Sequence, residues 1–196
     1  IGTWSGIKSA LPEQKRLGLV WVDAHMDSHT YATTPSNAIH GMPLACLLGH
    51  GDNHLTRIDS PFPKLFPEDV CLIGTRSFEE GEARLLQQLG VRIFFMDEIR
   101  CRGMEAIWNE ALSIVQRHTA GFGISLDLDV LDPQEEPGVG SPEPGGMLKK
   151  RLADMLSGLK DNAEFLGMEI VEYNPYLDTR FVTAEAICEL VTAIGQ

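Results

Sequence analysis

The chain has 196 residues, of which 43% are hydrophobic and 22% charged, and this length and composition predict one soluble globular domain spanning residues 1–196. Its formal net charge of −12 argues against nucleic acid as a partner, because phosphate binding needs a basic stripe that the sequence does not contain. No apolar run approaches the roughly 18 residues that a membrane-spanning helix requires, so a membrane partner is not expected.

Short apolar runs alternate with helical patterns along the chain. The runs are nearly continuous, which is typical of parallel strands covered by helices on both faces. The expected strands cover residues 17–22, 70–74, 91–95, 121–126 and 166–171. The expected helices cover residues 41–48, 79–89, 104–118, 147–159 and 183–194. This order predicts an α/β fold of three layers, αβα, with a mainly parallel sheet.

The first expected strand runs directly into the sequence DAHMD, residues 23–27. In an extended chain, residues two apart point to the same side, so Asp23, His25 and Asp27 are expected to face one point. The alternative is a capped strand end followed by a turn, because a single DxHxD pattern is short.

Several histidines follow in the next loops. For His29 and His40 the simpler interpretation is that each satisfies backbone groups of its loop, which is the common role of a lone histidine. His50 and His54 have a metal-like spacing, but they lie in a polar stretch and are expected to be solvated.

Acidic residues recur where the later strands end. Asp127 and Asp129 close the fourth expected strand in SLDLDVLDP, and Glu172 follows the fifth. The carboxyl ends of strands are where open α/β sheets bind their ligands. One site is therefore expected to collect these residues with those of DAHMD.

So many carboxylates in one place would repel each other and force protonation unless a cation were bound. Carboxylate oxygens with one imidazole and no thiolate favour Mn²⁺, or else Fe²⁺ or Co²⁺, over a structural zinc. The set is larger than one ion needs, which favours two ions bridged by shared aspartates.

With these residues in place, the sequence resembles the ureohydrolases, the manganese enzymes that include arginase, agmatinase and formiminoglutamase, and it is most similar to arginase. The resemblance covers nearly the whole chain. It is carried by DAHMD (23–27), TTPSNAIHGMPLA (33–45), GTRSFEEGE (74–82), SLDLDVLDP (125–133), GSPEPGG (140–146) and EIVEYNP (169–175).

The resemblance implies a set of metal ligands. Asp23 and Asp127 would bridge two Mn²⁺ ions, with His25 and Asp129 completing one ion and Asp27 serving the other. A bridging hydroxide would attack the guanidinium carbon of the substrate, and Asp127 or a neighbouring aspartate would assist proton transfer to the leaving amine.

The resemblance also implies substrate contacts and a second catalytic group. His40 would carry protons at the mouth of the site, and Glu172 would hold the guanidinium group. Ser77 and Glu79 would help to hold the α-amino group of the substrate, and Thr34 and Ser36 would contact its α-carboxylate. Glu82 and Ser141 are further implied contacts nearby.

The sequence also departs from the family pattern. The family takes a further metal-binding histidine from a GGDH segment that precedes a stretch like IGTWSG, where this chain begins, so the resemblance implies a chain truncated at its N-terminus, with strands missing there. One ion would then have only three protein ligands, and one ion in place of two is an open alternative. His29, Asn37 and Ala38 replace the asparagine, glycine and asparagine that arginases usually carry, and Ser77 replaces an acidic residue.

Three functions remain open at this point. The first is a manganese enzyme that cleaves L-arginine to ornithine and urea, and the second is the same chemistry on agmatine or another guanidino or amidino compound. The third is an inactive metal-binding or truncated family member. The four scattered cysteines, without a CxxC pair, indicate a reducing, cytoplasmic location, and the resemblance implies a homo-oligomer, a trimer or hexamer.

Overall fold

The computed structural model describes residues 1–195, in which five strands form one parallel sheet with the order β3-β2-β1-β4-β5. The strands are β1 (Gly18–Val22), β2 (Val70–Thr75), β3 (Arg92–Phe95), β4 (Phe122–Asp127) and β5 (Phe165–Val171). Each boundary lies within one residue of the predicted one. A continuous apolar run marks a parallel strand well because both of its faces are buried.

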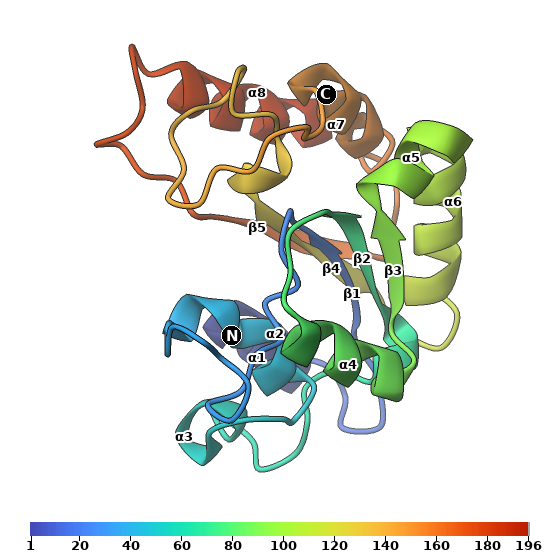
Figure 1. Cartoon of the computed structure of the whole chain (residues 1–196). Coiled ribbons are helices and arrows are strands. Elements are labelled where there is room, and N and C mark those ends of the chain that lie inside the picture. Colours follow the sequence, from blue (N-terminus) through green and yellow to red (C-terminus); the bar gives the residue numbers. More distant parts are fainter. Residues whose placement is uncertain (196) are drawn as a thin grey trace.

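Helices cover both faces of the sheet, as Figure 1 shows, so the predicted three-layer αβα fold is confirmed. One face carries α1 (Gly2–Ala10), α2 (Pro43–Leu47) and α4 (Glu80–Leu89). The other carries α5 (Met96–Arg102), α6 (Met104–Val115), α7 (Lys149–Ser157) and α8 (Val182–Gly195). A short helix, α3 (Asn53–Thr56), and three 3-10 turns, η1 (Ile39–Gly41), η2 (Pro67–Asp69) and η3 (Leu128–Val130), lie in the connections.

Alternate residues of the central strand supply the two cores. Val20 and Val22 of β1 belong to the core under α5–α8, whereas Leu19 and Trp21 belong to the core under α1, α2 and α4. The alternation follows from the period of two in a strand. Both cores therefore fix the position of β1, and with it the chain that leaves its carboxyl end.

Three helical expectations need correction or addition. The predicted helix 41–48 is instead the turn η1 followed by α2, which begins at Pro43, a residue suited to the first helical position. His54, expected in a loop, lies in α3, where Asp52 caps the helix by accepting from His54 N. Helix α1 was not predicted, and it packs Trp4 onto Gly123 of β4, where any Cβ would collide with the indole ring.

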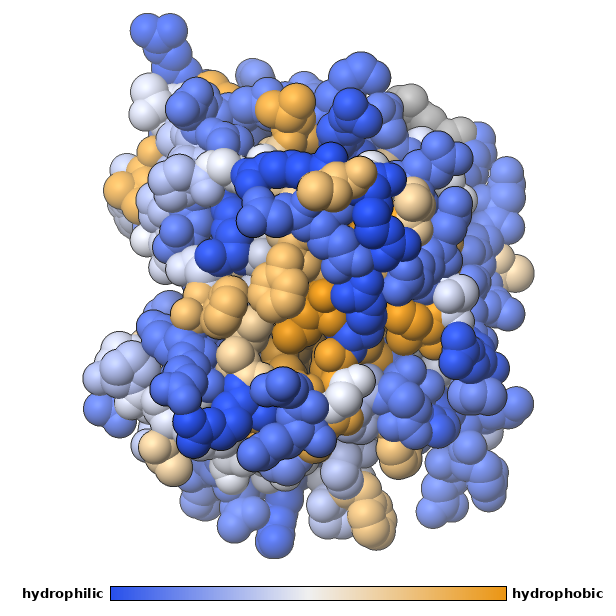
Figure 2. Space-filling view, turned by 45° about the vertical axis from the view of Figure 1, so that its right-hand side comes forward, coloured by the Kyte–Doolittle hydropathy of each residue, from blue (hydrophilic) through white to orange (hydrophobic). Residues whose placement is uncertain are grey.

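Figure 2 turns the β3 side of the molecule forward and shows apolar residues across the middle of this face, between two hydrophilic regions. Phe95, the last residue of β3, and Phe78, shortly before α4, are both exposed, with ring centroids 5.6 Å apart. Among residues 1–195, none of the helices is both long and apolar enough to cross a bilayer.

Candidate metal and substrate site

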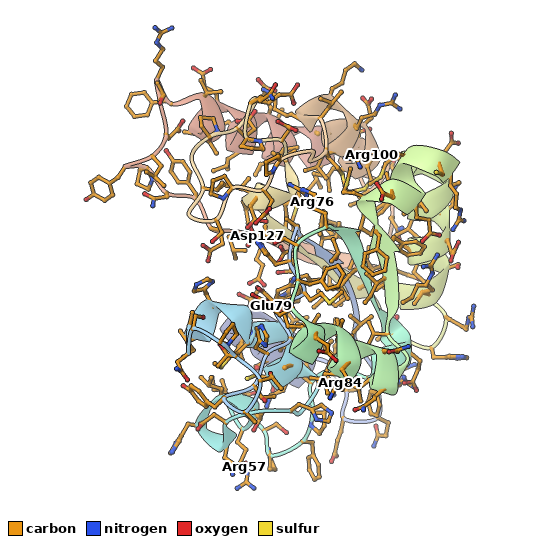
Figure 3. The ribbon with its side chains drawn as sticks, in the orientation of Figure 1. Arg57, Arg76, Glu79, Arg84, Arg100 and Asp127 are labelled. Atoms are coloured by element: carbon orange, nitrogen blue, oxygen red, sulfur yellow. The ribbon has the colours of Figure 1, made fainter. Side chains whose placement is uncertain are left out.

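The candidate site lies at the carboxyl ends of β1 and β4, the point from which successive strands are added in opposite directions. Open α/β sheets bind ligands at such a switch point. Asp23 directly follows β1, and Asp127 is the last residue of β4. Because Val22 pairs with Leu126, the two aspartates leave the sheet side by side. Figure 3 shows Asp127 at this edge, with Arg76 and Glu79 on either side.

The DAHMD segment is a turn rather than an extension of the strand. Asp23 Oδ1 accepts a hydrogen bond from His25 N at 2.6 Å, and Asp23 Oδ2 accepts from Trp21 Nε1 at 2.8 Å. Asp27 has a left-handed φ of 48°. The predicted reason for their convergence, an extended chain, was therefore wrong. The residues come together because the side chain of Asp23 accepts from the backbone two residues on and so forms a turn.

The second acidic motif is built in the same way. Asp127 Oδ1 accepts from Asp129 N at 2.9 Å and so caps η3, which means that Asp129 does not lie on a strand as expected. Asp129 Oδ1 in turn accepts from Ala24 N at 3.3 Å. This bond across the two motifs fixes the carboxylates of one against the backbone of the other.

His25 lies between carboxylates. Its Nδ1 is 3.0 Å from Asp129 Oδ2 and 3.5 Å from Asp23 Oδ1. Burial of the ring lowers the pKa of His25, but the bonds to Asp129 and Asp23 outweigh burial and raise the pKa to about 11. Burial, followed by repulsion from Asp23, holds the pKa values of Asp27 and Asp127 well above the usual range.

These five residues fit a hard divalent cation. Ligand atoms of Asp23, His25 and Asp129 all lie within 4.8 Å of one another. Burial, together with repulsion from the carboxylates of Asp23 and Asp129, raises the pKa values of Asp27 and Asp127. Buried carboxylates that repel one another are the arrangement that a bound cation stabilises, and the donor set of oxygens with one imidazole suits Mn²⁺.

A cavity of about 280 Å³ opens above these residues. Of the residues predicted for the site, all but Asp23 line it, and Asp23 is buried just below, 1% exposed. The predicted residues in the lining are His25, Asp27, Thr34, Ser36, His40, Ser77, Glu79, Glu82, Asp127, Asp129, Ser141 and Glu172. Within the described chain, the residues that line the cavity include no lysine or arginine.

A second group of titratable residues forms one wall of the cavity. His29 Nε2 is 3.0 Å from Glu79 Oε2 and 3.4 Å from Glu82 Oε2, and His29 Nδ1 is 3.1 Å from Thr33 Oγ1. The side chain of His29 thus bonds side chains, not the loop backbone as its simpler interpretation had it. The hydrogen bond with His29 lowers the pKa of Glu79, whereas burial raises that of Glu82.

Glu82 also has a structural role that the sequence did not indicate. With Glu79 it forms the capping box of α4, and its Oε1 accepts from Ser28 N at 3.2 Å. Glu82 therefore ties the end of the DAHMD turn to the start of α4. A substrate contact at Glu82 would have to share a carboxylate already engaged in these bonds.

Two residues of the site were not predicted. Glu143 lines the cavity, accepts from Ser77 Oγ at 3.0 Å and lies 3.7 Å from His25 Nε2. Arg76 donates to the carbonyl oxygens of Asp129 and Glu143, each at 2.8 Å. Glu143 lay within the quoted GSPEPGG motif, but nothing in the sequence indicated that its side chain would meet His25.

Comparisons with known proteins show which family the chain belongs to. The family model described as the arginase family matches residues 1–195, so the chain belongs to the arginase family. The arginase of Bacillus caldovelox is 40% identical over 194 residues, which cover 99% of this chain and 64% of that protein. The chain thus spans just under two thirds of the length of this relative.

Solved structures show the same fold. The B. caldovelox arginase structure has a TM-score of 0.93 at 39% identity, covering 98% of this chain and 64% of the other. The arginase of Entamoeba histolytica, solved in complex with L-ornithine, has a TM-score of 0.90 at 30% identity, with coverage of 98% and 64%. Formimidoylglutamase from Bacillus subtilis has a TM-score of 0.83 at 26% identity, with coverage of 98% and 55%.

Proposed function

We propose that the protein is a manganese-dependent amidinohydrolase that converts L-arginine to L-ornithine and urea. The observation that carries the proposal is one cavity that gathers four of the five candidate metal ligands and Glu172. The fifth candidate, Asp23, is buried, and its carboxylate lies within 4.8 Å of the ligand atoms of His25 and Asp129. Membership of the arginase family and the similarity to arginases from several organisms support it.

The residues that would hold manganese are Asp23, His25, Asp27, Asp127 and Asp129. They would provide ligands for at least one ion, and two is the number that the family resemblance implies. Bound manganese would supply a nucleophile at neutral pH by lowering the pKa of a water molecule.

The chain's own groups have separable tasks around the substrate. The carboxylate of Glu172 pairs with the planar guanidinium group, which fixes the orientation of the carbon to be attacked. His40 is exposed at the edge of the cavity, where an imidazole can carry a proton between the leaving amine and solvent. Asp127 would hold that proton on its carboxylate.

The opposite end of arginine would meet hydroxyl groups. Thr34 Oγ1 accepts from Asn37 N at 3.1 Å and Ser36 Oγ accepts from Ala38 N at 3.2 Å. Their hydroxyl oxygens are thereby fixed while their hydrogens can be donated to an α-carboxylate. Ser77, Glu79, Glu82 and Ser141 complete the proposed set of substrate contacts, with Glu79 facing the α-amino group.

A specific observation favours agmatine as the second candidate. Because no described residue that lines the cavity is a lysine or arginine, the α-carboxylate of arginine would have no charged partner there. Agmatine lacks that carboxylate, so it would leave less charge uncompensated.

Urea release from arginine, agmatine and guanidinobutyrate in the presence of Mn²⁺ separates the candidates. We expect arginine to have the highest kcat/KM, and the double variant Thr34→Val, Ser36→Ala to raise KM for arginine about tenfold or more while leaving agmatine turnover unchanged. Asp127→Asn should abolish urea release from every substrate. Faster turnover of agmatine than of arginine would reassign the substrate, and no urea release with any of them would contradict the proposal.

Three further expectations belong to this proposal. Residues 1–196 would form one domain, since both cores share the same sheet. A cytoplasmic location is supported by four free cysteines, two of them buried. A trimer or hexamer is expected from the family resemblance alone and can be checked by analytical ultracentrifugation.

A further inference from the structure

We propose that Glu143 is a positioning residue for the metal ligand His25. Its carboxylate faces Nε2 of the ring and keeps the proton there, so that Nδ1 is free to coordinate the ion. This inference rests on the proposed metal-dependent function and assigns a role to a residue outside the predicted ligand set.

The two ring nitrogens of His25 face different groups. Nδ1 points at Asp129 and Asp23, which are themselves candidate ligands, at 3.0 and 3.5 Å. Nε2 points the other way, 3.7 Å from Glu143 Oε1. A histidine that binds a metal through one nitrogen usually presents the N–H of the other to a carboxylate or carbonyl, which fixes the tautomer and raises the basicity of the ligand.

The carboxylate of Glu143 is itself held in place. Ser77 Oγ donates to Glu143 Oε1 at 3.0 Å, which is the same oxygen that faces His25. At 3.7 Å the contact with Nε2 is an ion-pair distance rather than a hydrogen bond, so Glu143 acts on the ring through its charge. Ser77 therefore sets the distance at which this charge acts.

The backbone of Glu143 is anchored by the neighbouring residue. Arg76 Nη2 donates to the carbonyl oxygens of both Glu143 and Asp129, each at 2.8 Å, so one guanidinium group joins the residues on the two sides of His25. Consecutive residues, Arg76 and Ser77, thus fix the backbone and the carboxylate of Glu143. A residue that positions a metal ligand must itself be held in place, and these two anchors hold Glu143.

The test is manganese binding to the protein, measured by isothermal titration calorimetry and by electron paramagnetic resonance with the metal alone. We expect Glu143→Ala to weaken binding at the His25 site about 10–100-fold, the range typical of lost outer-shell partners. Glu143→Gln should also weaken it, because the amide keeps the shape but not the charge. Ser77→Ala should have a smaller effect of the same kind.

The matched control is Glu135→Gln on the same loop, since Glu135 accepts from Lys149 N and does not line the cavity. It should bind manganese like the wild type. Metal-free variants should unfold at the wild-type temperature, because the side chain of Glu143 is 35% exposed.

Unchanged manganese affinity in Glu143→Ala together with a raised KM would overturn the inference and make Glu143 a substrate contact. Weakened manganese binding in that variant, with a wild type that binds manganese but releases no urea, would support the role of Glu143 while the proposed function failed. A wild type that binds no manganese would overturn both.

Discussion

At the scale of single residues, Glu172 combines the proposed contact with the guanidinium group and an unfavourable backbone conformation. It lies one residue beyond β5 with a φ of 65°, a left-handed conformation that residues other than glycine rarely adopt. The surrounding structure keeps the residue in this conformation, and its side chain lines the cavity. Strain of this kind collects at functional sites.

We therefore expect Glu172→Gly to raise the free energy of unfolding by about 1 kcal/mol while removing urea release, because glycine adopts positive φ without a steric penalty. Thermal unfolding and a urea assay check the two effects. Glu172→Ala is the matched control, since it removes the carboxylate and keeps the Cβ. Equal unfolding temperatures for the glycine and alanine variants would show that the backbone is not strained.

The sequence could place those candidate residues that are both chemically suited to the site and located at the end of a strand. Asp23, Asp127 and Glu172 each stand at or just after a strand end and could be placed by that rule alone. Glu143 and Arg76 could not be placed, because their contacts join loops that are far apart in the chain. Such contacts depend on tertiary packing, which no local pattern encodes.

At the scale of elements, the loop of residues 132–146 carries Ser141 and Glu143 to the cavity and is tied to the helices behind it. Glu136, 1% exposed, lies 3.6 Å from Lys149 Nζ at the start of α7, and Lys149 also pairs with Glu189 of α8 at 3.0 Å. Within the described chain, Glu136 Oε2 has no hydrogen-bond partner. The loop is thus held by the buried carboxylate of Glu136, whose negative charge is only partly balanced by Lys149.

Burial raises the pKa of Glu136 from an ordinary 4.5 to about 6, against the attraction of Lys149. Ionisation of Glu136 therefore lowers the free energy of unfolding. The loss is small below pH 4.5 and reaches about 1–2 kcal/mol above pH 6. We expect Glu136→Gln to raise the unfolding temperature by roughly 2–8 °C at pH 7.5 and hardly at all at pH 4.5.

Differential scanning calorimetry at the two pH values makes this comparison, with Glu164→Gln, at an exposed glutamate, as the control. The same gain at both pH values would mean that packing of the amide, rather than loss of a buried charge, is responsible.

The elements themselves were largely predictable, and the exceptions have a physical cause. Apolar runs in the sequence predict the five strands, whereas α1 contains Gly2, Ser5 and Gly6 and has little helical pattern of its own. It is stabilised by Trp4, which lies on Gly123 and donates to Glu169 of β5. Long-range packing decides such a helix, so the sequence alone did not reveal it.

At the scale of the whole molecule, the metal-free protein is expected to lose stability as pH rises. The folded state holds extra protons on Asp27 and Asp127, whose pKa values are raised well above the usual range, and on His25, whose pKa is about 11. An unfolded chain releases these protons near pH 4 and pH 6.5. Since the folded state binds more protons, the free energy of unfolding falls with rising pH throughout this window.

Manganese would reverse this dependence, because the ligands must give up their protons to bind it and the affinity therefore grows with pH. At a free concentration 100 times its Kd, the ion should add about 2.7 kcal/mol to the free energy of unfolding. We expect the rise in unfolding temperature on adding Mn²⁺ to be larger at pH 8.5 than at pH 6, and to vanish with excess chelator. In Asp127→Asn the metal-free protein should depend less steeply on pH and gain less from manganese, since one raised carboxyl is gone. A manganese effect that is equal at both pH values would show that the buried carboxylates and His25 are not the groups that bind the ion.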